Sequence, residues 1–213
     1  MTQDAAAAPR RGLFVAFEGG DGAGKSTQVR LLAAALERAG REVVVTRQPG
    51  GTALGSAIRD LVLHGGHVSP RAEALLYAAD KAHHVDELIR PALLRGADVL
   101  TDRYTDSSVA YQGAGRELGP QEIHDLLDWA VAGLFPDLTI VVDVPAAVGR
   151  ARRGDTHDRI ESEGDDFHER VRRHFLDLAA TAPGRYLVVD GTSAPEVMHG
   201  QVLERLRATG VTL

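Results

Sequence analysis

A glycine-rich segment near the start of the chain has the residue types that bind nucleotide phosphates. It reads Gly19-Gly20-Asp21-Gly22-Ala23-Gly24-Lys25-Ser26, fits the pattern G-x-x-x-x-G-K-[ST], and is followed by Thr27. Glycines let backbone N–H groups converge on phosphate oxygens, a lysine reaches the β and γ phosphates, and a serine hydroxyl binds Mg²⁺. The segment therefore predicts a site for a nucleoside triphosphate and Mg²⁺ at residues 19–27.

The arginines outside this loop indicate what kind of molecule accepts a phosphoryl group. Arg47 and Arg103 each follow an apolar segment, and Arg150, Arg152 and Arg153 cluster in a polar stretch. A sugar hydroxyl as acceptor would need a carboxylate base, whereas a nucleoside monophosphate is already ionised and needs none. Its difficulty is repulsion between two polyanions, which guanidinium groups relieve. The arginines therefore favour a monophosphate as the acceptor.

Five short apolar segments and the helical patterns between them must position these residues. The segments at 13–17, 43–45, 99–101, 138–142 and 186–189 are mostly continuous rather than alternating, which is typical of strands buried on both faces. Helical patterns cover 27–39, 52–63, 70–88, 120–131, 167–179 and 195–206. Strands that alternate with helices predict an α/β protein with a parallel sheet, whose ligands lie at the carboxyl ends of the strands.

Composition excludes several other classes of protein. The chain has 213 residues, a formal net charge of −6, 44% hydrophobic residues and no cysteine. The acidic balance argues against a general nucleic-acid or membrane-surface binder, and the lack of cysteine excludes disulfides and thiolate metal sites. No apolar run approaches the roughly 20 residues of a membrane span. We expect a cytoplasmic protein with a loose tail at 1–11, without a secretion signal, and a single domain at 12–213.

Several motifs, in order along the chain, resemble those of bacterial thymidylate kinase. The resemblance covers nearly the whole chain from Gly12 to the last helical segment. It is carried by Phe17-Glu18-Gly19 through Thr27, Thr46-Arg47-Gln48-Pro49-Gly50-Gly51-Thr52, Asp102-Arg103-Tyr104, Ser107 to Gln112, and Asp158-Arg159-Ile160-Glu161. It implies a three-layer P-loop nucleoside monophosphate kinase fold with a five-stranded parallel sheet. It also implies transfer of the γ-phosphoryl group of ATP, with Mg²⁺, to dTMP, which yields dTDP.

The resemblance also implies roles for single residues. Lys25 and Arg103 would be catalytic, and Arg103 would bind the acceptor phosphate with Arg47 close by. Asp21 would also be catalytic and would accept a hydrogen bond from the deoxyribose 3′-hydroxyl. Metal binding would fall to Ser26, Asp102 and Glu18. The remaining acceptor contacts would be the ring of Tyr77 on the base, Tyr111 under the sugar, and Lys81, Ser108 and Gln112 at the base edge.

A lid at approximately 148–164 would close over ATP and carry the remaining catalytic groups. Ala23 stands in the loop where relatives outside bacteria often have arginine, and the bacterial branch places catalytic arginine in the lid instead. This arrangement fits Arg150 and Arg153 as catalytic residues, with Arg153 the first choice, and Arg152 as an ATP contact. Because members of the family are commonly homodimers, the helix at 70–88 would also meet a second subunit.

Two departures from the family pattern leave the acceptor open. Lys81 stands where the family commonly has arginine, and Gln48 where it usually has glutamate. Lysine is a point donor and cannot reproduce a guanidinium fork. One alternative is therefore a kinase for another 5-substituted deoxyuridine monophosphate. Others are a deoxynucleoside kinase, for which no carboxylate base is better placed than Asp102 or Glu18, and a P-loop ATPase switch protein, which would not need arginines for a second phosphate.

Overall fold

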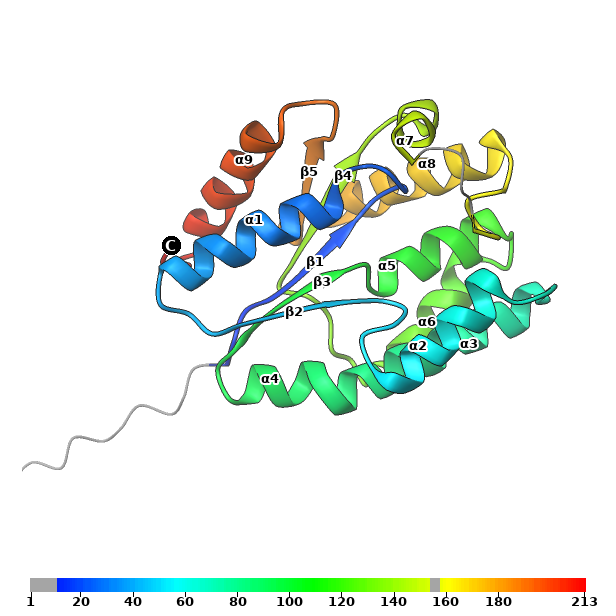
Figure 1. The fold of residues 1–213 in the computed structure, drawn as a ribbon, viewed down its shortest axis with the longest axis horizontal. Coiled ribbons are helices and arrows are strands. Elements are labelled where there is room, and N and C mark those ends of the chain that lie inside the picture. The colour runs from blue at the N-terminus through cyan, green and yellow to red at the C-terminus, as the bar shows by residue number, and fades with distance from the viewer. Residues whose placement is uncertain (1–10, 154–157) are drawn as a thin grey trace, which may run out of the picture.

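The computed structural model of the chain describes residues 11–153, apart from the side chain of Arg153, and residues 158–213. Within these residues it confirms the predicted α/β architecture (Figure 1). Residues 1–10 of the predicted tail (1–11) and residues 154–157 of the predicted lid lie outside the described residues. Arg11 is described, and its guanidinium donates to Asp137 at 2.8 Å.

The sheet has five strands in the order β2-β3-β1-β4-β5, and each neighbouring pair is parallel. The strands are β1 (Phe14–Glu18), β2 (Val43–Arg47), β3 (Asp98–Asp102), β4 (Leu138–Asp143) and β5 (Tyr186–Asp190). Each of the five predicted apolar segments forms one of them. The central position of β1 brings the glycine-rich loop to the middle of the carboxyl edge, between the ends of β3 and β4.

Helices cover both faces of this sheet. They are α1 (Lys25–Arg38), α2 (Ala53–Arg59), α3 (Pro70–His84), α4 (Arg90–Leu94), α5 (Thr105–Ser108), α6 (Pro120–Ala130), α7 (Ala146–Arg153), α8 (Asp165–Thr181) and α9 (Pro195–Ala208). On one face α1 packs against α9, and on the other α4 contacts β3 while α8 contacts β4 and β5 (Figure 1). Helix α3 contacts both α2 and α6 beside this second layer.

The core explains why the strand segments are apolar throughout. Alternate residues of β1 pack on opposite faces: Val15 and Phe17 join the cluster under α1 and α9, whereas Phe14 and Ala16 join the cluster under α4. All four side chains are 0–1% exposed. In β1, which is covered on both faces, no polar residue occurs until Glu18 ends the strand at the sheet edge.

The helices differ from the sequence prediction in two ways. Three π-helical segments, η1 (Asp60–His64), η2 (Val85–Ile89) and η3 (Val109–Gly115), continue the preceding α-helices, and η2 joins α3 to α4 just before Pro91. In addition, the sequence patterns do not predict the helical segments α5, η3 and α7. These segments are short or rich in glycine and polar residues, so they lack the apolar periodicity that identifies a helix.

No helix in the described ranges combines the length and the apolar character that crossing a membrane requires.

The buried carboxylate of Asp98, at the start of β3, should contribute measurably to the stability of the fold. Asp98 is 0% exposed, accepts the Leu13 N–H at 2.8 Å, and is bound by the guanidinium of Arg41. Asp98→Ala removes these charge-assisted bonds and leaves the Leu13 N–H without its acceptor. We expect the free energy of unfolding to fall by about 2 kcal/mol. Urea unfolding measures this change, and the exposed Asp128→Ala serves as the control, for which a comparable loss would contradict the assignment.

Candidate active site

The glycine-rich loop adopts a conformation that only glycine tolerates at several positions. Gly19, Gly22 and Gly24 have φ angles of 127°, 75° and 104°. Lys25 is 6% exposed, and its Nζ donates to the carbonyls of Gly19 (3.1 Å) and Gly20 (2.7 Å). The ammonium group is thus held at the start of α1, where the N-terminus of the helix favours an anion.

The loop also packs backbone to backbone against α7. A Cβ on Gly22 would lie 2.3 Å from the carbonyl oxygen of Gly149, and a Cβ on Gly149 would lie 2.4 Å from the carbonyl oxygen of Asp21. The two segments can approach this closely only because both positions are glycine. This contact places α7, which begins the predicted lid, directly against the phosphate-binding loop.

Two oxygen-bearing side chains that could bind a metal ion lie beside the loop. The Ser26 hydroxyl donates to Asp102 Oδ2 at 2.6 Å, which brings the first turn of α1 to the end of β3. A hydroxyl and a carboxylate are ligands of the kind that Mg²⁺ prefers. These are two of the three residues predicted for the metal.

The third predicted metal ligand, Glu18, lies in a different setting. It is 0% exposed, and its carboxylate accepts from Tyr104 N at 2.8 Å, Ser107 N at 3.1 Å and Ser107 Oγ at 2.5 Å. Burial raises the pKa of Glu18 to about 6, and the nearby Asp106 carboxylate adds to the increase. These bonds show that Glu18 fixes the turn between β3 and α5. Its part in a metal site stays a prediction.

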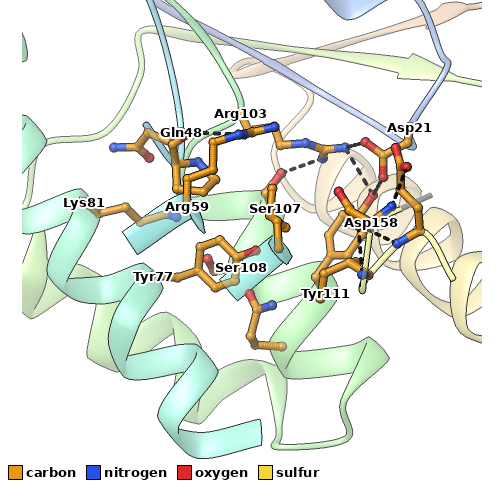
Figure 2. Close-up of a pocket in the computed structure, with 15 residues that line it drawn as sticks. Asp21, Gln48, Arg59, Tyr77, Lys81, Arg103, Ser107, Ser108, Tyr111 and Asp158 are labelled. Atoms are coloured by element: carbon orange, nitrogen blue, oxygen red, sulfur yellow. Dashed lines mark hydrogen bonds and ion pairs between the residues drawn. The ribbon is translucent and has the colours of Figure 1, made fainter. Parts of the chain in front are cut away.

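Arg103 connects this turn to the glycine-rich loop. Its Nη1 donates to Gly19 O and to Ser107 Oγ, both at 3.0 Å. Its Nη2 binds the Asp21 carboxylate and also donates to Tyr111 OH at 3.2 Å, while Tyr111 OH donates to Asp21 Oδ2 at 3.1 Å. Figure 2 shows the guanidinium group facing Asp21 and Ser107 with Tyr111 beside them. The backbone of Arg103 has a φ angle of 70°, a sparsely populated conformation for a non-glycine residue.

A cavity beside Arg103 brings together the predicted acceptor residues. Its lining includes seven of the eight predicted substrate contacts: Asp21, Tyr77, Lys81, Arg103, Ser108, Tyr111 and Gln112. Figure 2 shows Tyr77 and Lys81 from α3 lying across from Ser107 and Ser108 of α5. The eighth, Arg47, is exposed at the end of β2 and lines the adjoining cavity instead.

That second cavity lies over the glycine-rich loop. Its lining residues are Asp21, Gly22, Gly24, Lys25, Ser26, Thr27, Arg47, Gln48, Arg59, Asp102, Arg103 and Arg152. Four residues line both cavities: Asp21, Gln48, Arg59 and Arg103. The two spaces therefore meet at a boundary that contains two guanidinium groups.

The lid arginines occupy different positions. Arg152 lines the loop cavity and donates to Gly191 O at 2.9 Å, whereas Arg150 pairs with Asp165 at the start of α8. Arg153 ends α7, and its side chain lies outside the described residues.

Sequence reasoning missed two features of this boundary. Arg59 at the end of α2 donates to Pro49 O at 3.2 Å and lines both cavities. It carries no motif, and only its place in the last turn of a helix that follows the 46–52 motif could have drawn attention to it. The second feature is the support under Gln48. Gln48 Nε2 donates to His84 Nδ1 at 2.9 Å, and His84 Nε2 contacts Thr46 Oγ1 at 2.8 Å.

The contact with Gln48 selects one tautomer of His84. With the Gln48 amide nitrogen as the donor, Nδ1 accepts and Nε2 carries the proton that it donates to Thr46 Oγ1. His84 is 0% exposed, and burial lowers the pKa of its imidazole to about 4, with the Lys81 and His83 charges adding to the decrease. The neutral ring thus holds Gln48 at the boundary of the two cavities.

Comparison with known proteins gave consistent matches. A family model described as thymidylate kinase matches residues 17–202. The chain is 58% identical over 198 residues to thymidylate kinase of Clavibacter sepedonicus, which covers 91% of this chain and 94% of that protein. It is 57% identical over 192 residues to thymidylate kinase of Bifidobacterium longum (strain NCC 2705), covering 88% and 93%. A crystal structure of thymidylate kinase from Ehrlichia chaffeensis superposes with a TM-score of 0.78 at 31% identity, over 92% of this chain and 99% of that one.

The buried neutral ring of His84 should make the free energy of unfolding depend on pH. The folded-state pKa of His84 is about 4, below the ordinary value of 6.5 that it regains on unfolding. The unfolded chain therefore takes up a proton first as the pH falls, so the contribution of His84 is present above pH 6.5 and is lost between pH 6.5 and 4. We expect a loss of about 2 kcal/mol in the free energy of unfolding between pH 7 and pH 5.

Urea unfolding at the two pH values measures this loss. His84→Gln, which cannot titrate, should reduce the difference between pH 7 and pH 5 by that amount, whereas the exposed His124→Gln should not. An unchanged pH dependence in His84→Gln would show that the ring is already protonated in the fold.

Proposed function

The chain belongs to the thymidylate kinase family, and from this premise we propose that it transfers the γ-phosphoryl group of ATP to dTMP. The bond between the γ-phosphorus and the β,γ-bridging oxygen breaks, a bond forms between the γ-phosphorus and a dTMP phosphate oxygen, and the products are dTDP and ADP.

The observation that carries this proposal is the pair of adjoining cavities with Arg103 and Arg59 at their boundary. The cavity over the glycine-rich loop suits the triphosphate, and the neighbouring cavity suits a nucleoside monophosphate. Two anions can approach at this boundary because both guanidinium groups offset their repulsion. A protein that only bound and hydrolysed a triphosphate would need the first cavity alone.

Mg²⁺ fits the same geometry. Ser26 Oγ and Asp102 Oδ2 lie 2.6 Å apart beside the loop, and both are hard oxygen donors. We propose that these two residues hold the ion, directly or through water. When bound, Mg²⁺ would offset the negative charge that develops on the phosphate oxygens during transfer.

The residues of the chain supply positioning and positive charge rather than a base. The acceptor phosphate is largely ionised at pH 7, so no side chain has to remove a proton from it. Arg103 binds that phosphate, and Lys25 at the loop binds the β and γ phosphates of the donor. Arg152, which lines the loop cavity, is the described lid arginine best placed to reach the donor.

The sugar and base contacts follow from the cavity lining. Asp21 and Tyr111 hydrogen-bond to each other at 3.1 Å, and Tyr111 is 6% exposed. We propose that Asp21 accepts from the 3′-hydroxyl and that the Tyr111 ring leaves no room for a ribose 2′-hydroxyl. Tyr77 would then stack on the base, with Lys81 and Gln112 at its edge. Because Lys81 and Gln48 depart from the family pattern, an acceptor with a different 5-substituent on the uracil ring remains an alternative to dTMP.

The proposal extends to assembly and location. On α3, Leu75 is 59% exposed, and on α6, which α3 contacts, Trp129 is 82% exposed. Large exposed apolar side chains on adjacent helices support a homodimer formed through this face. The absence of cysteine from the sequence suits the reducing cytoplasm, where we propose the enzyme works.

An acceptor panel tests the reaction. With ATP and Mg²⁺, we expect kcat/KM to be highest for dTMP, lower for dUMP, and far lower for purine and ribonucleoside monophosphates. Arg103→Lys should lower kcat/KM for dTMP at least a hundredfold, because an ammonium cannot bind Gly19, Ser107, Asp21 and the phosphate in one geometry. ADP release in a coupled assay measures both.

Arg38→Ala, at the exposed end of α1, is the control for the arginine variant. ADP release at one rate with and without dTMP would overturn the kinase assignment in favour of a nucleotide-switch ATPase.

The buried lysine in the acceptor cavity generates a pH prediction. Lys81 is 1% exposed, and burial lowers its pKa to about 8, although the Asp80 and Glu18 carboxylates oppose the decrease. Its ammonium therefore loses the proton as pH rises through 8. If the charged form binds the acceptor, kcat/KM for dTMP should fall up to about tenfold between pH 7 and pH 9. Lys81→Arg, which stays charged, should flatten this decline, and a decline of the same size in that variant would assign it to another group.

A further inference from the structure

A buried carboxylate behind the acceptor cavity has no part in the reaction proposed above. Glu73, in the first turn of α3, is 0% exposed. The guanidinium of Arg159 binds its Oε2, and Arg116 approaches both carboxylate oxygens at 3.4 and 3.5 Å. Arg116 also pairs with Glu163. These contacts balance the charge of Glu73 and hold its carboxylate in one place.

The third group that contacts this carboxylate lines the acceptor cavity. Gln112 Nε2 donates to Glu73 Oε1 at 2.8 Å, and Gln112 itself is 2% exposed and lines the acceptor cavity. A side-chain amide can usually rotate by half a turn and exchange its oxygen for its nitrogen at little cost. Here it cannot, because a carboxylate held by two guanidinium groups only accepts hydrogen bonds. The NH₂ group must face Glu73, and Oε1 is left for the cavity.

We propose that Glu73 is a specificity-determining positioning residue, which fixes the Gln112 amide so that the cavity presents a hydrogen-bond acceptor to the edge of the base. This inference rests on the proposed function. A pyrimidine with an N3–H donor, as in thymine and uracil, matches that acceptor. Cytosine has an unprotonated N3 at the same position, so two acceptors would face each other, and the buried amide oxygen would lose its partner.

The consequence is a selectivity against cytosine that depends on a residue outside the cavity lining. Glu73 is absent from that lining and acts only through Gln112. The 5-methyl group plays no part in the contact. Changes at Glu73 should therefore alter discrimination between dTMP and dCMP without altering discrimination between dTMP and dUMP.

Glu73→Gln tests the inference. Its amide can present either an acceptor or a donor, so Gln112 becomes free to turn its NH₂ group to the cavity. We expect the ratio of kcat/KM for dCMP to that for dTMP to rise about tenfold, while the dUMP to dTMP ratio stays within twofold of wild type. A general loss of packing would lower all three values together and leave both ratios unchanged.

Further variants keep the test decisive. Glu73→Asp retains the charge opposite Arg116 and Arg159 but shortens the reach to Gln112, and it should raise the dCMP to dTMP ratio to a smaller extent. Glu163→Gln breaks the outer ion pair of Arg116 without touching Gln112, and it should leave the ratio at the wild-type value. In Gln112→Met, which lacks the amide, adding Glu73→Gln should have no further effect on the ratio.

The outcomes separate the two proposals. Wild-type activity on dTMP with unchanged ratios in both Glu73 variants would overturn the role of Glu73 and leave the proposed function standing. The same ratio change in Glu163→Gln as in Glu73→Gln would assign the effect to the ion-pair cluster in general and also overturn it. Absence of dTMP phosphorylation by the wild type would overturn both.

Discussion

The guanidinium of Arg103 is the interaction on which the site depends, because it joins elements that the chain keeps far apart. It connects the loop after β1, through Gly19 and Asp21, to Ser107 on α5 and Tyr111 on η3. Without this cation the carboxylate of Asp21 would lose the ion pair that it makes beside Tyr111. The same guanidinium lies at the boundary of the two cavities, where we propose that the acceptor phosphate joins its existing partners.

Buried polar groups behind the site share one pattern. Glu18 holds the turn that carries Arg103, His84 holds Gln48, and Glu73 holds Gln112. Each supporting group is 0% exposed and has one protonation or tautomeric form in which its hydrogen bonds are satisfied. Burying such groups is unfavourable unless every partner is in place, so each of them limits the orientations of the side chain that it supports.

Close backbone approach complements these side-chain contacts. Gly22 and Gly149 bring the phosphate-binding loop and α7 together at distances that a Cβ would prevent. The arginines of α7 are thereby placed beside the loop that we propose binds the donor phosphates. Under that proposal, groups at the carboxyl edge of the sheet orient the donor, the acceptor and helix α7 together.

The sequence by itself determined the strands, the phosphate-binding loop and the kind of chemistry. The five strands could be read directly because both faces of the sheet are covered, which requires unbroken apolar runs such as residues 14–17. The loop could be read because its glycine, lysine and serine spacing follows from the geometry of a phosphate. The helices α5 and α7 could not, because neither has an apolar stripe long enough to be recognised.

Only the tertiary structure decided which polar residues line the site and which support it. Glu18 and Asp102 both end apolar strands, yet one is buried against the Tyr104–Ser107 turn and the other meets Ser26 beside the loop. Arg59, His84 and Glu73 lie on helices with no motif around them. The importance of His84 and Glu73 comes from partners 36 and 86 residues away in the chain, Gln48 and Arg159. A local pattern shows what a residue type can do. Long-range packing decides which groups it meets, because hydrogen bonds depend on positions within a few tenths of an ångström that no sequence spacing specifies.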